Sequence, residues 1–168
     1  IISGYTGDEK KQNTKEILPE FYEKVGYSQG YFGGDLKPES LRWDFENNQQ
    51  DLIVINLGTN DYSYCKENQY KRKEFTKRYE EFLKVVRENN PQSNILCTLG
   101  IKGAELFECI EKAVDNYMSS FEDEKIYVMK FEEQVIEDGL AADYHPTEKT
   151  NIKAAAQLVE KIKAIMNW

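Results

Sequence analysis

One short segment constrains the fold of this chain more than any other. Residues 52–57 (Leu-Ile-Val-Ile-Asn-Leu) contain a single polar side chain, Asn56, and are rich in isoleucine and valine. A strand has this composition when helices cover both faces of its sheet, because side chains of both orientations are then buried. The segment therefore predicts a central strand of a parallel sheet.

Helical and strand patterns alternate along the rest of the chain. Apolar residues three or four positions apart predict helices, and short apolar runs predict strands. The expected elements are a helix over 15–25 capped by Thr14, a helix over 70–89, a strand over 94–99, a helix over 104–119, a strand over 126–131 and a last helix capped by Thr147 or Thr150. Residues 1–13 and 26–50 are expected to be irregular. The order predicts an α/β fold, a three-layer α/β/α, flavodoxin-like arrangement in a single domain over residues 1–168.

The same pattern predicts an incomplete sheet. A strand as apolar as residues 52–57 needs a neighbour on each edge, but only two clear strands follow it and residues 1–50 offer no comparable one. We therefore expect that one or two N-terminal strands are missing from this chain, so that the domain is N-terminally incomplete. Because an unpaired edge is a template for pairing, association through this exposed sheet edge is expected.

The composition is that of a globular domain and argues against several partners. Hydrophobic residues make up 40% of the chain and aromatic residues 12%. The net charge of -8 and the lack of a dense Lys/Arg cluster argue against nucleic acid and anionic membranes. No apolar run approaches the roughly 20 residues that a bilayer span needs. The cysteines lack the spacing of zinc sites or disulfide frameworks, and Cys97 and Cys109 are expected to be packing residues. No metal or cofactor is implied.

A polar turn follows the first strand. Residues 58–61 (Gly-Thr-Asn-Asp) come directly after the apolar segment, at the carboxyl end of the strand, where ligands and catalytic groups gather in open α/β sheets. The side-chain amide of Asn60 can donate a hydrogen bond to an oxyanion without titrating. The alternative is that Asn60 and Asp61 only form a turn that caps a helix.

The only histidine of the chain, His145, lies in a polar segment before the last helix. Residues 143–146 (Asp-Tyr-His-Pro) do not have the composition of a core segment. A histidine titrates near neutral pH, so it can take a proton from a serine and return it to a leaving alcohol. Asp143 could orient the ring as the acid of a Ser-His-Asp triad does, or it could be solvated. The two polar segments together suggest hydrolysis of an acyl ester.

These segments resemble conserved blocks of the GDSL, or SGNH, hydrolases. Residues 58–61 are similar to the third block of that family and residues 143–146 to the fifth. More narrowly, residues 43–45 (Trp-Asp-Phe), 51–61 and 142–147 resemble the catalytic domain of family 2 carbohydrate esterases, which remove acetyl groups from plant polysaccharides and oligosaccharides. The resemblance implies an SGNH hydrolase fold and suggests a secreted or cell-surface bacterial protein.

The resemblance also implies roles for individual residues. Asn60 corresponds to the oxyanion-hole asparagine and His145 to the catalytic base. Where the superfamily has an aspartate three residues before the histidine, this chain has Ala142, and in the esterases the histidine can instead lean on a backbone carbonyl; the role of Asp143 stays open. Candidates to contact the substrate, with packing as the alternative for the aromatic ones, are Gly58, Tyr62, Tyr144 and Trp43.

The nucleophile of this family is not found in the chain. The Gly-Asp-Ser block is absent, and Ser3 is expected to be a loop residue. Ser63 and Cys65 follow Asn60 closely and are the alternatives within the chain. The expected function is a serine esterase whose serine lies upstream and whose substrate is an acetylated carbohydrate or another small acyl ester. A non-catalytic carbohydrate-binding remnant and one piece of a two-chain or processed esterase are the alternatives.

Overall fold

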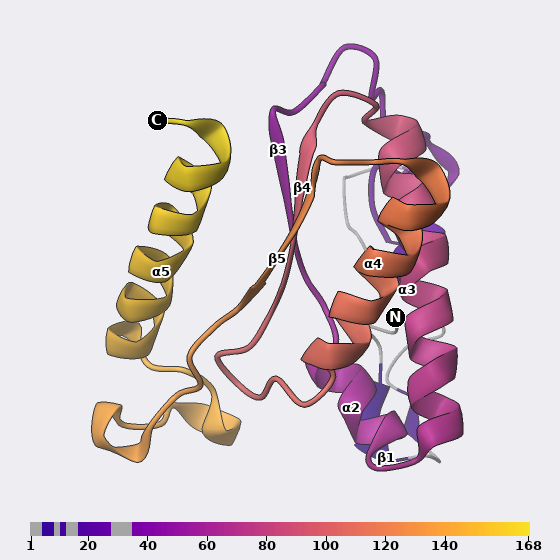
Figure 1. The fold of residues 1–168 in the computed structure, drawn as a ribbon. Helices are drawn as coiled ribbons and strands as arrows, with labels where there is room; N and C mark the ends of the chain where they lie inside the picture. The colour runs from indigo at the N-terminus through magenta and orange to yellow at the C-terminus, as the bar shows by residue number, and fades with distance from the viewer. Residues whose placement is uncertain (1–4, 9–10, 13–16, 28–34) are drawn as a thin grey trace.

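The computed structural model describes residues 5–8, 11–12, 17–27 and 35–168. Three parallel strands form its central layer in the order β3 (Leu52–Asn56), β4 (Asn94–Leu99), β5 (Ile126–Lys130). Helices α3 (Gln69–Asn89) and α4 (Phe107–Phe121) cover one face of this sheet, and α5 (Glu148–Met166) lies on the other (Figure 1). The expected three-layer α/β/α arrangement around a parallel sheet is confirmed.

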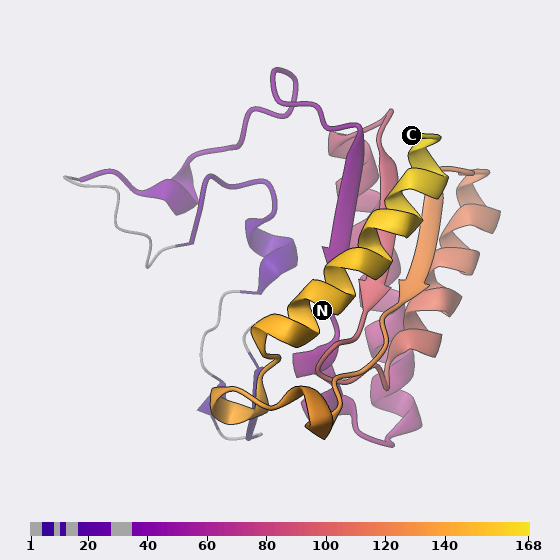
Figure 2. The same cartoon turned by 90° about the vertical axis from the view of Figure 1, so that its left-hand side faces the viewer.

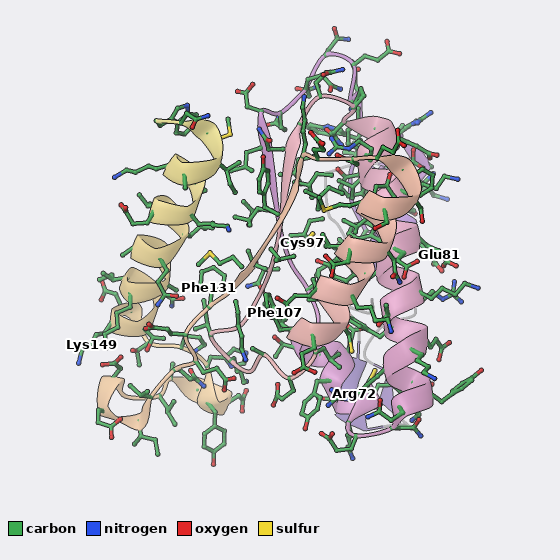
Figure 3. All side chains as sticks on the ribbon, viewed as in Figure 1. Arg72, Glu81, Cys97, Phe107, Phe131 and Lys149 are labelled. Carbon is green, nitrogen blue, oxygen red and sulfur yellow. The ribbon has the colours of Figure 1, made fainter. Side chains whose placement is uncertain are left out.

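The main core lies between the sheet and the two helices α3 and α4. Ile95, Cys97 and Leu99 alternate along β4 and point into it, because successive side chains of a strand face opposite sides. Cys97 is fully buried there, as expected (Figure 3). The opposite face of the sheet meets α5 less closely, and Val54 and Thr98 line a hollow of about 230 Å³ beneath that helix.

The free edge of β3 agrees with the expectation of an incomplete sheet. In the part of the chain that the structure describes, β3 pairs with β4 alone, so the strand predicted to be central in a complete sheet is an edge strand here. No other described segment lies along its free edge in hydrogen-bonding register, and Val54 is 39% exposed. Residues 17–27 lie on the side of this edge in Figure 2 but add no strand to the sheet.

The N-terminal segments are more ordered than the sequence predicts in one place and less helical in another. Residues expected to be loop form a short antiparallel pair, β1 (Tyr5–Asp8) and β2 (Lys11–Gln12), in which β1 lies against α2 (Thr59–Cys65). The tertiary contact with α2 outweighs the weak local pattern. The helix cap expected at Thr14 and the loop position expected for Ser3 lie outside the described residues.

The helix expected over residues 15–25 is only one turn long, α1 (Leu18–Phe21). Pro19 starts this turn, since its fixed φ angle suits the first turn of a helix. The helix ends where the chain turns to pair with a later segment: the Trp43 amide donates to the carbonyl oxygen of Glu23 at 2.9 Å, and the Val25 amide donates to that of Leu41 at 3.0 Å. The ring of Tyr22 packs there against Phe45 and Phe82, at 5.4 Å between ring centroids in each pair. A single 3₁₀ turn over Pro38–Ser40 interrupts the otherwise irregular connection to β3.

Three further elements were not expected from the sequence. The connection after β3 is only two residues long, Leu57 and Gly58, because α2 begins at Thr59. Short 3₁₀ turns over Ile136–Asp138 and Ala142–Tyr144 lie between β5 and α5. Thr147 caps α5, because its side chain accepts a hydrogen bond from the Thr150 amide. Of the two residues expected as this cap, Thr147 and Thr150, the first is confirmed.

Gly100, directly after β4, provides a test of the packing at this end of the sheet. Its φ angle is 136°, and an added Cβ atom would lie 2.8 Å from Cβ of Phe131 and 3.0 Å from the Phe131 carbonyl oxygen. We expect Gly100→Ala to lower the free energy of unfolding by about 2–4 kcal/mol, because backbone strain and a steric clash add together. Urea denaturation followed by circular dichroism measures this change.

Gly139→Ala is the matched control for this substitution. Gly139 also has a positive φ angle, 78°, but its added Cβ would meet only Cγ2 of Thr147, at 3.5 Å. We expect a loss of about 1–2 kcal/mol from backbone strain alone. Equal losses for the two variants would contradict the packing described around Gly100.

No helix among the residues that the structure describes combines the length and apolar character needed to cross a membrane.

Candidate active site

The candidate site lies at the carboxyl ends of the three parallel strands. Asn60 belongs to the first turn of α2, which follows β3, and His145 belongs to the connection between β5 and α5. Both segments lie at the same end of the sheet in two views (Figure 1, Figure 2). The topology therefore brings together two residues that are 85 positions apart in the sequence.

The ring of His145 is held by the backbone just before it. Its Nδ1 atom lies 2.9 Å from the carbonyl oxygen of Ala142. Because a carbonyl oxygen only accepts hydrogen bonds, Nδ1 carries the proton in this arrangement and Nε2 has the free lone pair. The His145 side chain is exposed, so Nε2 is accessible to a proton donor from outside the turn.

The carboxylate of Asp143 does not take part in this arrangement. The Asp143 side chain is exposed and makes no hydrogen bond or ion pair with any described residue, whereas its backbone carbonyl accepts a hydrogen bond from Lys102 Nζ at 2.6 Å. Asp143 and the next residue, Tyr144, both have left-handed φ angles, 53° and 58°. This backbone path returns the chain so that the His145 ring meets the carbonyl of Ala142.

Asn60 is presented by a turn that requires glycine. Gly58 has a φ angle of 139°, and an added Cβ would lie 3.1 Å from Leu99 Cδ1 and 3.4 Å from the ring of Phe75. The chain can therefore turn sharply from β3 into α2 while it packs against the core. Asn60 is exposed in the first turn of α2, next to Asp61, which is buried.

The other substrate-contact candidates lie in three different places. Tyr144 is 73% exposed beside His145. Tyr62 is half-buried on α2, and its hydroxyl donates to Glu67 Oε1 at 3.1 Å, a bond that raises the pKa of the phenol. Trp43 lines a hollow with Asn89 and Pro91, which lie at the end of α3 and just before β4, and therefore at the amino ends of the strands. The structure thus places Tyr62 and Tyr144, but not Trp43, at the same end of the sheet as Asn60 and His145.

A surface ion-pair cluster, in which two exposed lysines cover the carboxylate of Asp138, fastens the connection that carries His145 to α5. Oδ1 of Asp138 lies 2.7 Å from Lys149 Nζ, and its Oδ2 is paired with Lys153. The hydrogen bonds from these two ammonium groups lower the pKa of the Asp138 carboxyl. Thr147, the cap of α5, donates from Oγ1 to the Asp138 carbonyl oxygen at 2.9 Å. The contacts fix the connection shortly before and shortly after the turn of His145.

Sequence comparison assigns this arrangement to a family. The family model for GDSL-like lipases and acylhydrolases matches residues 7–158 of the chain. The chain belongs to the GDSL-like lipase/acylhydrolase family. The expected resemblance is confirmed, and both polar segments fall within the matched region.

Individual relatives of this GDSL-like chain are esterases that act on carbohydrate by name. Cellulase/esterase CelE of Acetivibrio thermocellus is 30% identical over 154 residues, which are 89% of this chain and 18% of that protein. The structure of a family two carbohydrate esterase from Clostridium thermocellum in complex with cellohexaose has a TM-score of 0.66 at 30% identity, covering 79% of this chain and 42% of that one. The acetyl xylan esterase Est2A from the rumen bacterium Butyrivibrio proteoclasticus shares the fold, with a TM-score of 0.83 at 24% identity over 90% of this chain and 46% of its own. The chain spans less than half of each of these relatives.

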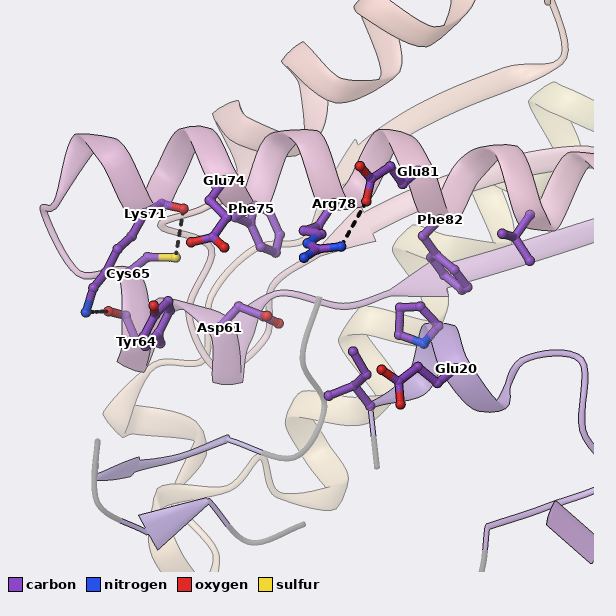
Figure 4. Close-up of a pocket in the computed structure, with 13 residues that line it drawn as sticks. Glu20, Asp61, Tyr64, Cys65, Lys71, Glu74, Phe75, Arg78, Glu81 and Phe82 are labelled. Carbon is purple, nitrogen blue, oxygen red and sulfur yellow. Dashed lines mark hydrogen bonds and ion pairs between the residues drawn. The ribbon is translucent and has the colours of Figure 1, made fainter. Parts of the chain in front are cut away.

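The nucleophile candidates within the GDSL-like chain are poorly suited to the reaction. Cys65 is 2% exposed, and its thiol lines a hollow of about 480 Å³ between α2, α3 and α1 (Figure 4). Neither Asn60 nor His145 is among the described residues that line this hollow. Burial, with a smaller contribution from the nearby Asp61 carboxylate, raises the pKa of the Cys65 thiol to about 11. The thiol is therefore protonated at neutral pH and is not an activated nucleophile.

We expect iodoacetamide to alkylate Cys65 at least a hundredfold more slowly in the folded protein than in urea at pH 8. The raised pKa alone, about 11 against an ordinary 9.0, lowers the thiolate fraction about a hundredfold, and burial slows access further. Between about pH 9 and pH 11 the folded state keeps this proton while the unfolded state has lost it. The free energy of unfolding should therefore be unaffected by this thiol below pH 9 and should fall as the pH rises from 9 towards 11. Peptide mass spectrometry measures both rates, with half-buried Cys109 as the internal comparison. Similar rates in the two states would contradict the buried position.

Sequence reasoning missed two residues beside His145. Lys102 lies in the turn after β4, with its Nζ atom 3.4 Å from Nδ1 and 3.5 Å from Nε2 of His145. Gln134 lies after β5 and donates from Nε2 to the carbonyl oxygen of Tyr144 at 2.7 Å. For Lys102 the sequence did carry a signal: Gly100 and Gly103 flank it directly after a predicted strand and mark a tight turn at the carboxyl end of the sheet, where sites form.

No group of three or more His, Cys, Asp or Glu side chains that could hold a metal ion occurs among the described residues.

Proposed function

We propose that the protein containing this chain is a serine esterase that removes O-acetyl groups from carbohydrate. The hydrogen bond of 2.9 Å between His145 Nδ1 and the Ala142 carbonyl supports this function most directly, because it leaves Nε2 free to act as a base. The exposed amide of Asn60 at the same end of the sheet is the candidate donor to the oxyanion. The names of CelE and of the family two esterase support a carbohydrate ester as the substrate. The name of a further relative, the acetylxylan esterase / glucomannan deacetylase of Cellvibrio japonicus, 24% identical over 90% of this chain, supports the acetyl group.

In this mechanism the serine oxygen attacks the acetyl carbonyl carbon while His145 Nε2 takes the serine proton. The carbonyl oxygen becomes an oxyanion, which the Asn60 amide stabilises. The intermediate collapses, the bond to the sugar oxygen breaks, and His145 returns the proton to that oxygen. Water then attacks the acetyl-enzyme with the same base, and acetate leaves.

We infer that the nucleophilic serine is supplied from outside residues 1–168, because the chain lacks a Gly-Asp-Ser block and the described residues offer no suitable serine. No serine of the described residues makes a hydrogen bond with His145; these serines are Ser40, Ser63, Ser93, Ser119 and Ser120. Ser63 lies on α2, half-buried, and the thiol of Cys65 is protonated at neutral pH. Residues 1–168 alone should therefore be inactive towards acetyl esters.

The test compares residues 1–168 with a polypeptide extended by the sequence encoded before Ile1. The extended protein should release acetate from acetylated xylan and from 4-nitrophenyl acetate, and a serine-directed inhibitor should abolish the release. Residues 1–168 should release none. Binding of acetylated xylan by the extended protein without release of acetate would instead favour a non-catalytic carbohydrate-binding function.

A further inference from the structure

Three residues around His145 hold backbone conformations that only glycine adopts readily. The φ angles are 74° at Ile101, 53° at Asp143 and 58° at Tyr144. Such conformations cost about 1–3 kcal/mol each and persist only where surrounding contacts hold them in place. For Ile101, whose side chain branches at Cβ, a positive φ angle is a clear outlier. The other non-glycine residues with positive φ among those described, Lys66, Glu122 and Asn167, each end a helix, so outside the helix ends such angles occur only in the segments around His145.

Hydrogen bonds from two side chains hold these strained segments together. Lys102 Nζ donates to the carbonyl oxygen of Asp143 at 2.6 Å, and Gln134 Nε2 donates to that of Tyr144 at 2.7 Å. The backbone amide of Gln134 in turn donates to the carbonyl oxygen of Ile101 at 2.8 Å. The turn after β4, the segment after β5 and the turn of His145 thus form one closed set of contacts.

We propose that Lys102 and Gln134 are positioning residues that hold the turn of His145 in its base-competent form. The inference rests on the proposed esterase function. Ala142 and His145 lie on either side of the two left-handed residues, and each of these residues has its carbonyl held by one of the two side chains. Relaxation of either residue towards an ordinary φ angle would move the ring away from the Ala142 carbonyl, and Nδ1 would lose the acceptor that fixes the tautomer.

The location of Lys102 fits a positioning role rather than proton transfer. Its Nζ atom is nearly equidistant from the two ring nitrogens, at 3.4 and 3.5 Å, so it does not lie along the lone pair of either one. Its shorter contact is the bond of 2.6 Å to the Asp143 carbonyl. The strained residue Ile101 directly precedes Lys102 and sets the direction in which this side chain leaves the turn.

The kinetic test is Lys102→Met in the extended protein, which removes the ammonium donor but keeps an unbranched side chain. Loss of the bond to Asp143 should displace the His145 ring and lower kcat about a hundredfold with little change in KM, because misplacement of a catalytic group by about 1 Å costs that much. The matched control is Lys125→Met. Lys125 Nζ also donates to a backbone carbonyl, that of Gln92 at 3.2 Å, but at the amino ends of the strands, so kcat should stay unchanged.

The spectroscopic test follows the tautomer of His145 by ¹⁵N NMR of histidine-labelled extended protein. The His145 signals are those that His145→Ala removes. Wild type should show the Nδ1–H tautomer, and Lys102→Met should show a mixture of both tautomers, a change that a merely destabilised protein would not produce while it stays folded. Gln134→Met should act in the same direction and serves as the second variant where Lys102→Met does not fold.

The outcomes separate this inference from the proposed function. A wild-type protein that hydrolyses no ester would contradict the esterase function, while its ¹⁵N spectra would still report whether Lys102 holds the turn. An active wild type whose Lys102→Met and Gln134→Met variants keep kcat within threefold would contradict the positioning role. A loss of kcat with the Nδ1–H tautomer unchanged would also overturn it, because Lys102 would then act by another route.

Discussion

His145→Ala should lower kcat for 4-nitrophenyl acetate roughly 10⁴-fold or more in the extended protein, since a serine without its base is a poor nucleophile. The expected loss is large because the ring Nε2 serves twice, first as acceptor of the serine proton and then as donor to the leaving sugar oxygen. The exposed ring contributes little packing, so the protein should stay folded. Stopped-flow or steady-state release of 4-nitrophenol measures the effect, and circular dichroism checks the fold.

Asp143→Asn is the matched variant for this prediction. Its carboxylate is exposed and makes no hydrogen bond with His145, whose Nδ1 meets the Ala142 carbonyl instead. The asparagine keeps the shape of the residue and tolerates the left-handed conformation, so kcat should fall less than tenfold. A loss as large as that of His145→Ala would make Asp143 the acid of a triad, and activity of His145→Ala within tenfold of wild type would remove His145 from the mechanism.

The central layers of the fold were predictable because local pattern and tertiary structure agree there. The strand over 94–99 has the expected bounds, and the strands at 52 and 126 begin at the expected residues. Their side chains are apolar because two helical layers surround the sheet, which is the property that the sequence pattern reports. Helix α3 was predicted to within one residue at its start because its cap, Asn68, precedes a regular apolar stripe.

The N-terminal region was not predictable because long-range contacts override its local signals. The expected helix stops after one turn because residues 23–25 bond to residues 41–43, and such contacts between distant residues leave no periodic trace in the sequence. The open edge of β3 was predicted, by contrast, because only two further clear strands follow it in the sequence. An apolar strand indicates that neighbours are needed, but it does not indicate which segment supplies them.

The candidate site divides in the same way. Asn60 and His145 could be predicted as candidates because their residue types carry the chemistry and they lie in short polar segments, one after a strand and one before a helix. Lys102 and Gln134 act through backbone carbonyls, and any residue type offers a carbonyl, so no motif marks their partners. The left-handed angles at Asp143 and Tyr144 were equally hidden, because tyrosine rarely adopts them.

Asn60→Ala should lower kcat roughly 10²–10³-fold with little change in KM, because the bond from its amide strengthens only when the carbonyl oxygen becomes an oxyanion. The first turn of α2 provides a rigid support for this donor, and Gly58 lets that helix start within two residues of the sheet. Asn60→Asp keeps the size of the side chain but replaces the donor with a negative charge, so it should lose at least as much activity.

Asn116→Ala is the control that separates loss of a catalytic donor from loss of an ordinary side-chain amide. Asn116 on α4 donates to Glu80 Oε1 at 2.7 Å on the outer helical layer, so its removal should leave both kinetic constants unchanged. Steady-state kinetics on acetylated xylan and 4-nitrophenyl acetate should then show the same loss of kcat for Asn60→Ala on both substrates, because the oxyanion forms on the acetyl group that they share. A change confined to KM, or a loss seen with the polysaccharide alone, would make Asn60 a substrate-binding residue instead.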